Sequence, residues 1–118
     1  MSGLNTALYT GTLAASATET SLVTGVAKTA TGASAPGLYS VTLDLRTMQM
    51  GDQLLLTVYD TAINGGAQGV KFTNTYTNIN LKPIDETIPV RLSNNWDFTL
   101  TMLSATSRSI VYAVNSVT

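Results

Sequence analysis

The sequence predicts an all-β protein, a single β-sandwich of about eight antiparallel strands with a jelly-roll-like arrangement. Apolar and polar residues alternate with a period of two in several segments. Turn-forming residues separate these segments at intervals of about 8–12 residues, which is typical of a sandwich or barrel. No segment combines a sustained 3.6-residue apolar period with helix caps. Seven-stranded immunoglobulin-like sandwiches are the nearest alternative, although the Cys, Trp, Cys spacing of true immunoglobulin domains is absent.

Two segments show the alternation of a half-buried strand most clearly, residues 38–45 and 96–102. Their core-facing side chains are expected to be Tyr39, Val41, Leu43, Leu45, Trp96, Phe98, Leu100 and Met102. In a third segment, 110–115, both alternating sets are apolar, so this strand is expected to be covered on both faces.

The remaining strands are expected near 6–14, 20–27, 53–61, 69–79 and 87–92. Pro89 indicates an edge strand for the last of these, because proline cannot donate a hydrogen bond to a neighbouring strand. Asn-Gly and Gly-Gly within residues 63–69 predict a hairpin connection. Residues 45–50 form a helical turn or two at most.

The length of 118 residues fits one domain, and neither a repeat nor a long linker divides it. The prediction is one sandwich domain over 1–118. Residues 1–6 are uncharged and form an N-terminal arm that orders on a partner, or the simple frayed end that is commoner.

Charged residues are scarce, at 11% of the chain with a net charge of −1, against about 25% in typical domains. Threonine, serine and asparagine replace them. Such a surface favours association between copies, although Thr-rich strands alone would also explain the composition.

The same composition argues against several classes of protein. The chain has no basic stripe for nucleic acid, no apolar run long enough to span a membrane and no signal peptide at its start. The absence of cysteine favours synthesis in a reducing cytoplasm.

Catalytic chemistry is not expected, because the chain has neither histidine nor cysteine. Nucleophilic triads, zinc sites and thiolate sites all need one or the other. The adjacent carboxylates Asp85 and Glu86 are expected in a solvated loop. Residues 60–65 lack the acidic positions of a calcium loop. We therefore expect no enzyme, and no catalytic, cofactor-binding or metal-binding residues.

Interface residues are the remaining functional candidates. Arg46, Arg91 and Arg108 are expected to anchor a protein interface, to pair internally with Asp44, Asp52 or Asp97, or to be ordinary surface arginines. Leu4 and Asn5 join them as arm residues. Met48 and Met50 are expected to close the end of the core, with exposure to a neighbour as the alternative, and Trp96 is expected in the core rather than on a sugar-binding platform.

Two stretches resemble a known family. The first is Gly37 to Leu45, followed by Met48, by Gly51-Asp52 and by a strand ending Thr57-Val58-Tyr59; the second is Asn95 to Thr101, followed by Ala105 to Ser109. Together they resemble small jelly-roll proteins of tailed bacteriophages, the capsid decoration or cement proteins. The resemblance covers about half of the chain, its motifs are mostly fold-forming, and no family binding residue is carried over.

The resemblance implies a homo-oligomer, with a trimer favoured, that binds the outside of a phage head and bridges major capsid subunits. The protein would be made in the host cytoplasm and reside on the virion surface. The alternatives are a tail, baseplate or fibre component, and a glycan-binding jelly-roll module.

Overall fold

The computed structural model describes residues 5–29, 32–63, 65–77, 83–87, 89–104 and 107–117, and these contain strands and turns but no helix. The strands are β1 (Asn5–Ala15), β2 (Thr20–Ser21), β3 (Gly37–Asp44), β4 (Gln53–Thr61), β5 (Gln68–Thr77), β6 (Ile84–Glu86), β7 (Val90–Leu92), β8 (Asp97–Met102) and β9 (Arg108–Val117). The all-β prediction is therefore confirmed. Within the same residues no segment forms a helix that could cross a bilayer.

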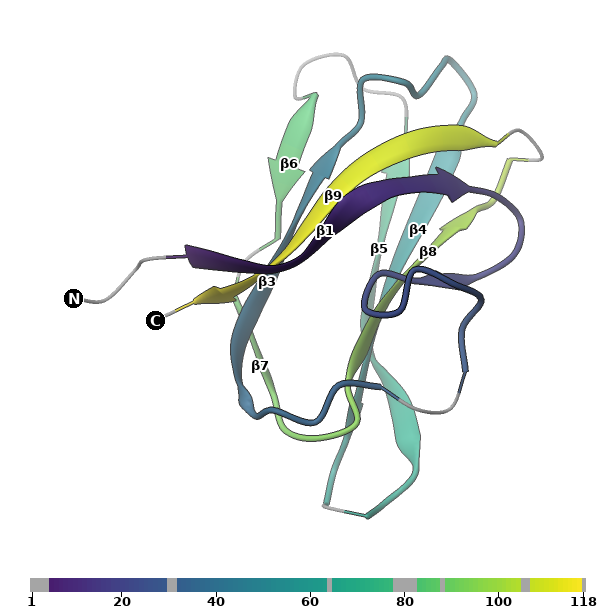
Figure 1. The fold of residues 1–118 in the computed structure, drawn as a ribbon. Coiled ribbons are helices and arrows are strands. Elements are labelled where there is room, and N and C mark those ends of the chain that lie inside the picture. Colours follow the sequence, from purple (N-terminus) through teal and green to yellow (C-terminus); the bar gives the residue numbers. More distant parts are fainter. Residues whose placement is uncertain are drawn as a thin grey trace.

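The strands form two antiparallel sheets packed face to face (Figure 1). Sheet A has the order β1-β9-β3-β6, with β7 also paired to β3, and sheet B has the order β2-β8-β4-β5. If β6 and β7 are taken as one interrupted strand, the strands pair from the chain ends inward: β1 with β9, β2 with β8, β3 with β6 and β7, and β4 with β5. This is an antiparallel ribbon rolled into two sheets, which is the jelly-roll arrangement.

The predicted strands agree with the structure except at three places: the segment 20–27, the strand β6 that was not predicted, and the segment 87–92, where the strand is Val90–Leu92. Residues 53–61 match β4 at both ends, whereas of the segment 20–27 only Thr20–Ser21 is a strand. Ser21 explains the difference, because its Oγ accepts hydrogen bonds from the backbone N–H groups of Val23 and Thr24 and turns the chain, and Gly25 follows at φ +77°.

Asp85 and Glu86 were expected in a loop, and this prediction is wrong. They belong to β6 and pair with Leu43 and Thr42 of β3. Their strand is short because Pro89 interrupts the edge between β6 and β7, as an edge position allows. Over residues 45–50 the chain makes turns and no helix.

The core lies between the two sheets, and the alternating residues of the two clearest strands fill it. Trp96 is 1% exposed, and its ring lies 4.2 Å from that of Tyr39 and 5.7 Å from that of Phe98, measured between centroids. Its Nε1 donates a hydrogen bond of 2.8 Å to the carbonyl of Ala35. The prediction that Trp96 packs in the core is confirmed.

The segment between β2 and β3 crosses the sandwich and is fastened to the backbone beside Trp96. Ala33 and Trp96 exchange two backbone hydrogen bonds of 2.8 and 2.9 Å. The preceding residue, Gly32, donates its N–H to the side chain of Asn95. Asn95 itself has a φ of 50°, which is unusual for a residue with a side chain and reflects the tight turn before β8.

The first and last strands lie side by side, and the start of β1 and the end of β9 lie at the same side of the sandwich (Figure 1). Asn5 pairs with Val117 and Thr6 with Ser116. The arm expected over residues 1–6 therefore overlaps β1 at these two positions, and residues 1–4 lie outside the described residues.

Candidate interaction surface

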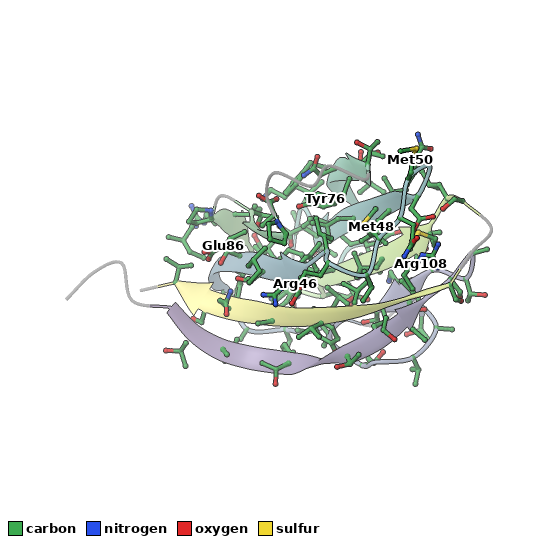
Figure 2. All side chains as sticks on the ribbon, turned by 90° about the horizontal axis from the view of Figure 1, so that it is seen from above. Arg46, Met48, Met50, Tyr76, Glu86 and Arg108 are labelled. Atoms are coloured by element: carbon green, nitrogen blue, oxygen red, sulfur yellow. The ribbon has the colours of Figure 1, made fainter. Side chains whose placement is uncertain are left out.

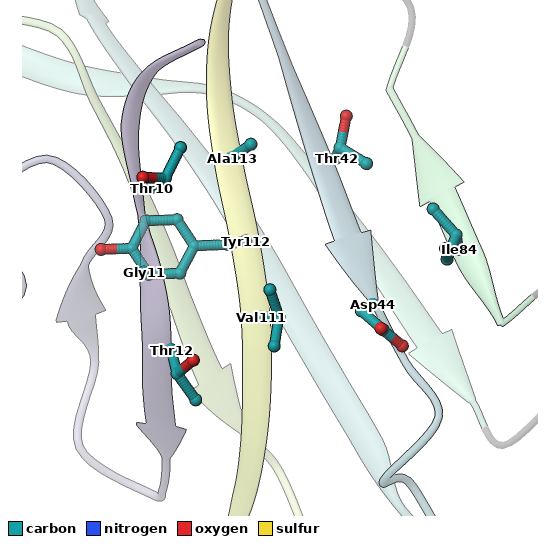
Figure 3. Close-up of a pocket in the computed structure, with 9 residues that line it drawn as sticks. All are labelled: Thr10, Gly11, Thr12, Thr42, Asp44, Ile84, Val111, Tyr112 and Ala113. Atoms are coloured by element: carbon teal, nitrogen blue, oxygen red, sulfur yellow. The ribbon is translucent and has the colours of Figure 1, made fainter.

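The outer face of sheet A is formed by two rungs of side chains that cross four strands. One rung is Thr12, Val111, Asp44 and Ile84, and the other is Thr10, Ala113, Thr42 and Glu86. We call these eight residues face A. Seven of them, together with Gly11 and Tyr112, line a shallow open hollow of about 480 Å³ (Figure 3).

Face A is largely uncharged. Val111 and Ile84 are each half exposed, and threonine methyl and hydroxyl groups surround them. The carboxylate of Asp44 lies 3.3 Å from Nε of Arg46, so the one charged group that lines the hollow has a partner. Hydroxyl and methyl groups are cheap to desolvate compared with charges. This surface therefore suits contact with another protein.

The polar groups beside face A bond to one another. Asn115 donates from Nδ2 to the hydroxyl oxygens of Ser40 at 3.4 Å and Thr42 at 3.1 Å, and Ser40 donates to Oε2 of Glu86 at 2.8 Å. Asn115 is nearly buried, so the prediction that β9 is covered on both faces holds for this end of the strand, whereas Val111 is exposed. These internal bonds lower the desolvation penalty of covering the face.

The outer face of sheet B carries a buried polar cluster beneath residues 16–29. Thr99 Oγ1 donates to Oε2 of Glu19 at 2.6 Å, and the hydroxyl of Tyr59 donates to the same oxygen. The ammonium of Lys28 lies 3.5 Å from Oδ2 of Asp97 and 4.5 Å from the centroid of the Tyr59 ring. These contacts attach the segment to the sheet, because its charged groups face inward.

Asp97 is the most deeply buried carboxyl of this cluster. Burial raises its pKa, while a hydrogen bond from Ser21 of 2.7 Å, the charge of Lys28 and the N–H of Phe98 oppose the shift. Burial and the bond to Glu19 raise the pKa of Tyr59 to about 12. The cluster is enclosed, since the Lys28 side chain is 12% exposed and that of Asp97 is 1% exposed. Its role is structural.

Among the five interface candidates from the sequence, the four that the structure describes do not gather in one place. Leu4 lies outside the described residues, and Asn5 begins β1. Arg46 follows β3, whereas Arg91 in β7 pairs with Leu38 near the other end of that strand. Arg108 lies at the start of β9, and Figure 2 shows it far from Glu86 in that view.

Two of the arginines have the internal partners that were considered. Arg46 pairs with Asp44, with its own side chain 64% exposed. Arg108 Nε donates to Oδ2 of Asp52 at 2.6 Å. This bond, with a further bond from the N–H of Gln49, lowers the pKa of the Asp52 carboxyl. Asp97 pairs with a lysine instead of an arginine. Whether any of the three arginines also contacts a partner stays a prediction.

The two methionines next to β3 have different environments (Figure 2). Met48 is 6% exposed and closes the end of the core as predicted. Met50 is 92% exposed, so the same prediction is wrong for it. Gly51, with φ +88°, turns the chain directly after Met50, and Asp52 Oδ2 accepts a 2.8 Å bond from the N–H of Gln49. The turn leaves the intervening methionine in solvent.

Asp60, the acidic residue of the segment considered for calcium binding, accepts hydrogen bonds from the backbone of two nearby segments. Its carboxylate accepts N–H bonds from Thr61 at 2.8 Å and from Ser93 at 3.0 Å. Burial raises its pKa, but these bonds and the charge of Lys71 outweigh burial and lower it overall. Within the described part of the chain, no three acidic side chains gather in a way that could hold a metal ion.

The sequence did not point to Glu19 or Lys28, the residues that hold the covering segment. Both lie in a stretch without a clear period, so no local pattern indicates that they face inward.

Comparison with protein-family models, with curated protein sequences and with solved structures finds no match to this chain.

Proposed function

We propose that this chain is a capsid decoration protein that binds the outside of a phage head and stabilises it by bridging major capsid subunits. The observation that carries the proposal is face A, a broad sheet surface in which six of the eight residues are uncharged, with a shallow hollow. A cement protein needs such a surface, because it must lie flat across neighbouring subunits and exclude water there.

Two further features support the proposal. The strand order, with β6 and β7 taken as one strand, is that of a jelly roll, as in the proteins that the two sequence stretches resemble. The chain also carries little charge for its size, so repulsion between neighbouring copies on a shell would be small. On this proposal the protein belongs to the virion surface, and its partners are its own copies and the major capsid protein.

The glycan-binding alternative has fewer candidate residues than the sequence offered. A sugar platform needs an exposed aromatic ring, whereas Trp96, Tyr39 and Tyr112 are all less than 10% exposed, and Tyr9, Tyr59 and Tyr76 are partly buried. The fold gives no comparable reason to prefer a tail or fibre role.

The test is to measure binding of the purified protein to phage heads assembled without it, by co-sedimentation and quantitative mass spectrometry. Val111→Glu should reduce binding at least about tenfold, because it puts a charge that would have to be desolvated in the centre of face A. Val70→Glu is the matched control, since Val70 is a similarly exposed valine on sheet B.

Many copies per head for the unchanged protein, lost with Val111→Glu and kept with Val70→Glu, would support the proposal. A chain that occurs only once per tail, or that does not bind heads at all, would refute it.

A further inference from the structure

The sheets of this sandwich end in four strand edges within the described residues. Sheet A ends at β1 and at β6 with β7, and sheet B ends at β2 and β5. An exposed edge presents unpaired N–H and C=O groups, which can accept another strand. Proteins commonly protect such edges with short strands, proline, lysine or other charges.

Three of the four edges carry such protection. β2 is only two residues long. The edge formed by β6 and β7 is interrupted at Pro89 and carries Asp85, Glu86 and Arg91. β5 carries Lys71, whose side chain is 40% exposed and lies 3.5 Å from the carboxylate of Asp60.

The β1 edge differs from the other three. It is 11 residues long, from Asn5 to Ala15, and contains no charged residue and no proline. Residues 6–8 and 10–12 are all exposed, so neither the covering segment nor sheet B covers this stretch. Its one irregularity is a bulge between Ala7 and Tyr9. The edge is therefore long, neutral and open over most of its length.

We infer that β1 pairs antiparallel with β1 of a second copy of this chain, about a twofold axis. An extended strand can pair with the donors and acceptors of an edge along its whole length, in place of water. A second copy offers the same edge, and a twofold axis brings the two edges together in the antiparallel sense. Because β1 is uncharged, no like charges oppose each other across the axis.

This pairing would join the two copies of sheet A into one continuous sheet. Thr10 and Thr12 belong both to β1 and to face A, so the two faces would meet at the axis. The inference rests on the proposed function, because a joined face could span neighbouring capsid subunits.

Cysteine trapping tests the contact directly, because the chain has no cysteine of its own. Thr10→Cys and Thr12→Cys place single thiols on β1, and Thr75→Cys places one on the exposed β5 edge as the control. In a twofold pair, Thr10 lies opposite Thr10 of the other copy if the axis crosses that residue, and opposite Thr12 if the axis crosses Gly11. Opposite residues on one face of an antiparallel pair have Cβ atoms about 4.5–5.5 Å apart, close to what a disulfide needs. At least one β1 variant, or the equimolar mixture of the two, should form a linked dimer under mild oxidation much faster than the control. Equal rates would overturn the inference.

Light scattering of the reduced proteins supplies a second, independent measurement. The unchanged chain should have the mass of two chains at micromolar concentration. The double variant Thr10→Lys, Thr12→Lys should weaken the dimer at least about tenfold, because like charges would face each other. The matched variant Thr73→Lys, Thr75→Lys on β5 should remain dimeric. Circular dichroism verifies that each variant is folded.

The outcomes separate this inference from the proposed function. A monomer, or a three-chain assembly without cross-linking through β1, would overturn the edge pairing while heads could still bind the protein. A dimer linked through β1 that fails to bind phage heads would support the pairing and refute the decoration role.

Discussion

The close approach between Gly32 and the backbone of Trp96 makes Gly32→Ala a demanding test of the fold. A Cβ atom placed on Gly32 would lie 2.2 Å from the carbonyl oxygen of Trp96 and 2.8 Å from its carbonyl carbon. Both atoms belong to the backbone, so a side-chain rotation cannot relieve the clash. The segment before β3 would have to move outward by roughly 1 Å.

That movement would disturb the two backbone hydrogen bonds between Ala33 and Trp96. Overpacking alone destabilises by about 1–3 kcal/mol, and each weakened hydrogen bond adds about 0.5–1.5 kcal/mol. We therefore expect Gly32→Ala to lower the free energy of unfolding by about 2–6 kcal/mol. Domains of this size are stable by only about 5–15 kcal/mol, so the change is large.

Urea unfolding followed by tryptophan fluorescence measures this effect, because Trp96 is the only tryptophan and is buried. Gly69→Ala is the control, since no atom lies within 4 Å of a Cβ at Gly69. Its effect should stay within about 1 kcal/mol. Equal unfolding midpoints for the two variants would show that the segment does not approach Trp96 as described.

Three further predictions concern ionisable groups. Arg108→Leu should lower the melting temperature at neutral pH, and the decrease should become smaller as the pH falls. The pKa of Asp52 is lower in the folded protein than its value of about 3.9 in the unfolded chain. The ion pair therefore adds stability above about pH 3.9, and this stability is lost as the pH falls through the folded pKa. Tyr59, with its pKa raised to about 12, should ionise well above pH 10 in an ultraviolet titration, and the stability it contributes should be lost as the pH rises through that interval. Lys28→Met should lower the free energy of unfolding by about 3–5 kcal/mol at neutral pH, because it leaves the Asp97 carboxylate buried without its charged partner. Urea unfolding should show that part of this stability returns as the pH falls and Asp97 takes up a proton.

The arginine and lysine predictions each have a control variant. Arg46→Leu removes an exposed ion pair and should change stability by less than about 1 kcal/mol. Adding Asp97→Asn to Lys28→Met removes the unpaired charge and should restore part of the loss at neutral pH. A pH-independent effect of Arg108→Leu, or ionisation of all the tyrosines near pH 10, would contradict the described contacts.

The period of two was a reliable guide to the inner faces of the strands. It placed Trp96, Phe98, Leu100 and Met102 in the core, and all four are buried. The same pattern failed for Asp97 and Thr99, which point outward and are nevertheless buried. The residues that cover them come from another part of the chain, since Ser21 lies 76 positions from Asp97 and Glu19 lies 80 positions from Thr99. No local pattern carries that information.

The short strands β2 and β6 were predicted wrongly for a related reason. A side chain that bonds to its own backbone ended β2 at Ser21, and an apolar alternation cannot reveal such a bond. The two adjacent acidic residues, Asp85 and Glu86, predicted a loop. Their pairing with β3 makes this segment a strand, and the local sequence does not show that pairing. Asp44 and Asp52 were among the arginine partners anticipated from the sequence. Face A, in contrast, depends on the register across four strands and needed the structure.

The pairing of Asn5 with Val117 has a mechanical consequence. Hydrogen bonds between antiparallel strands run perpendicular to the strands. A force that pulled these two ends apart would therefore load the rungs between β1 and β9 one at a time, and the strands would unzip at low force. If the protein reinforces a phage head, as proposed, tension should enter through its sheet faces or along its strands instead, where many bonds share the load at once.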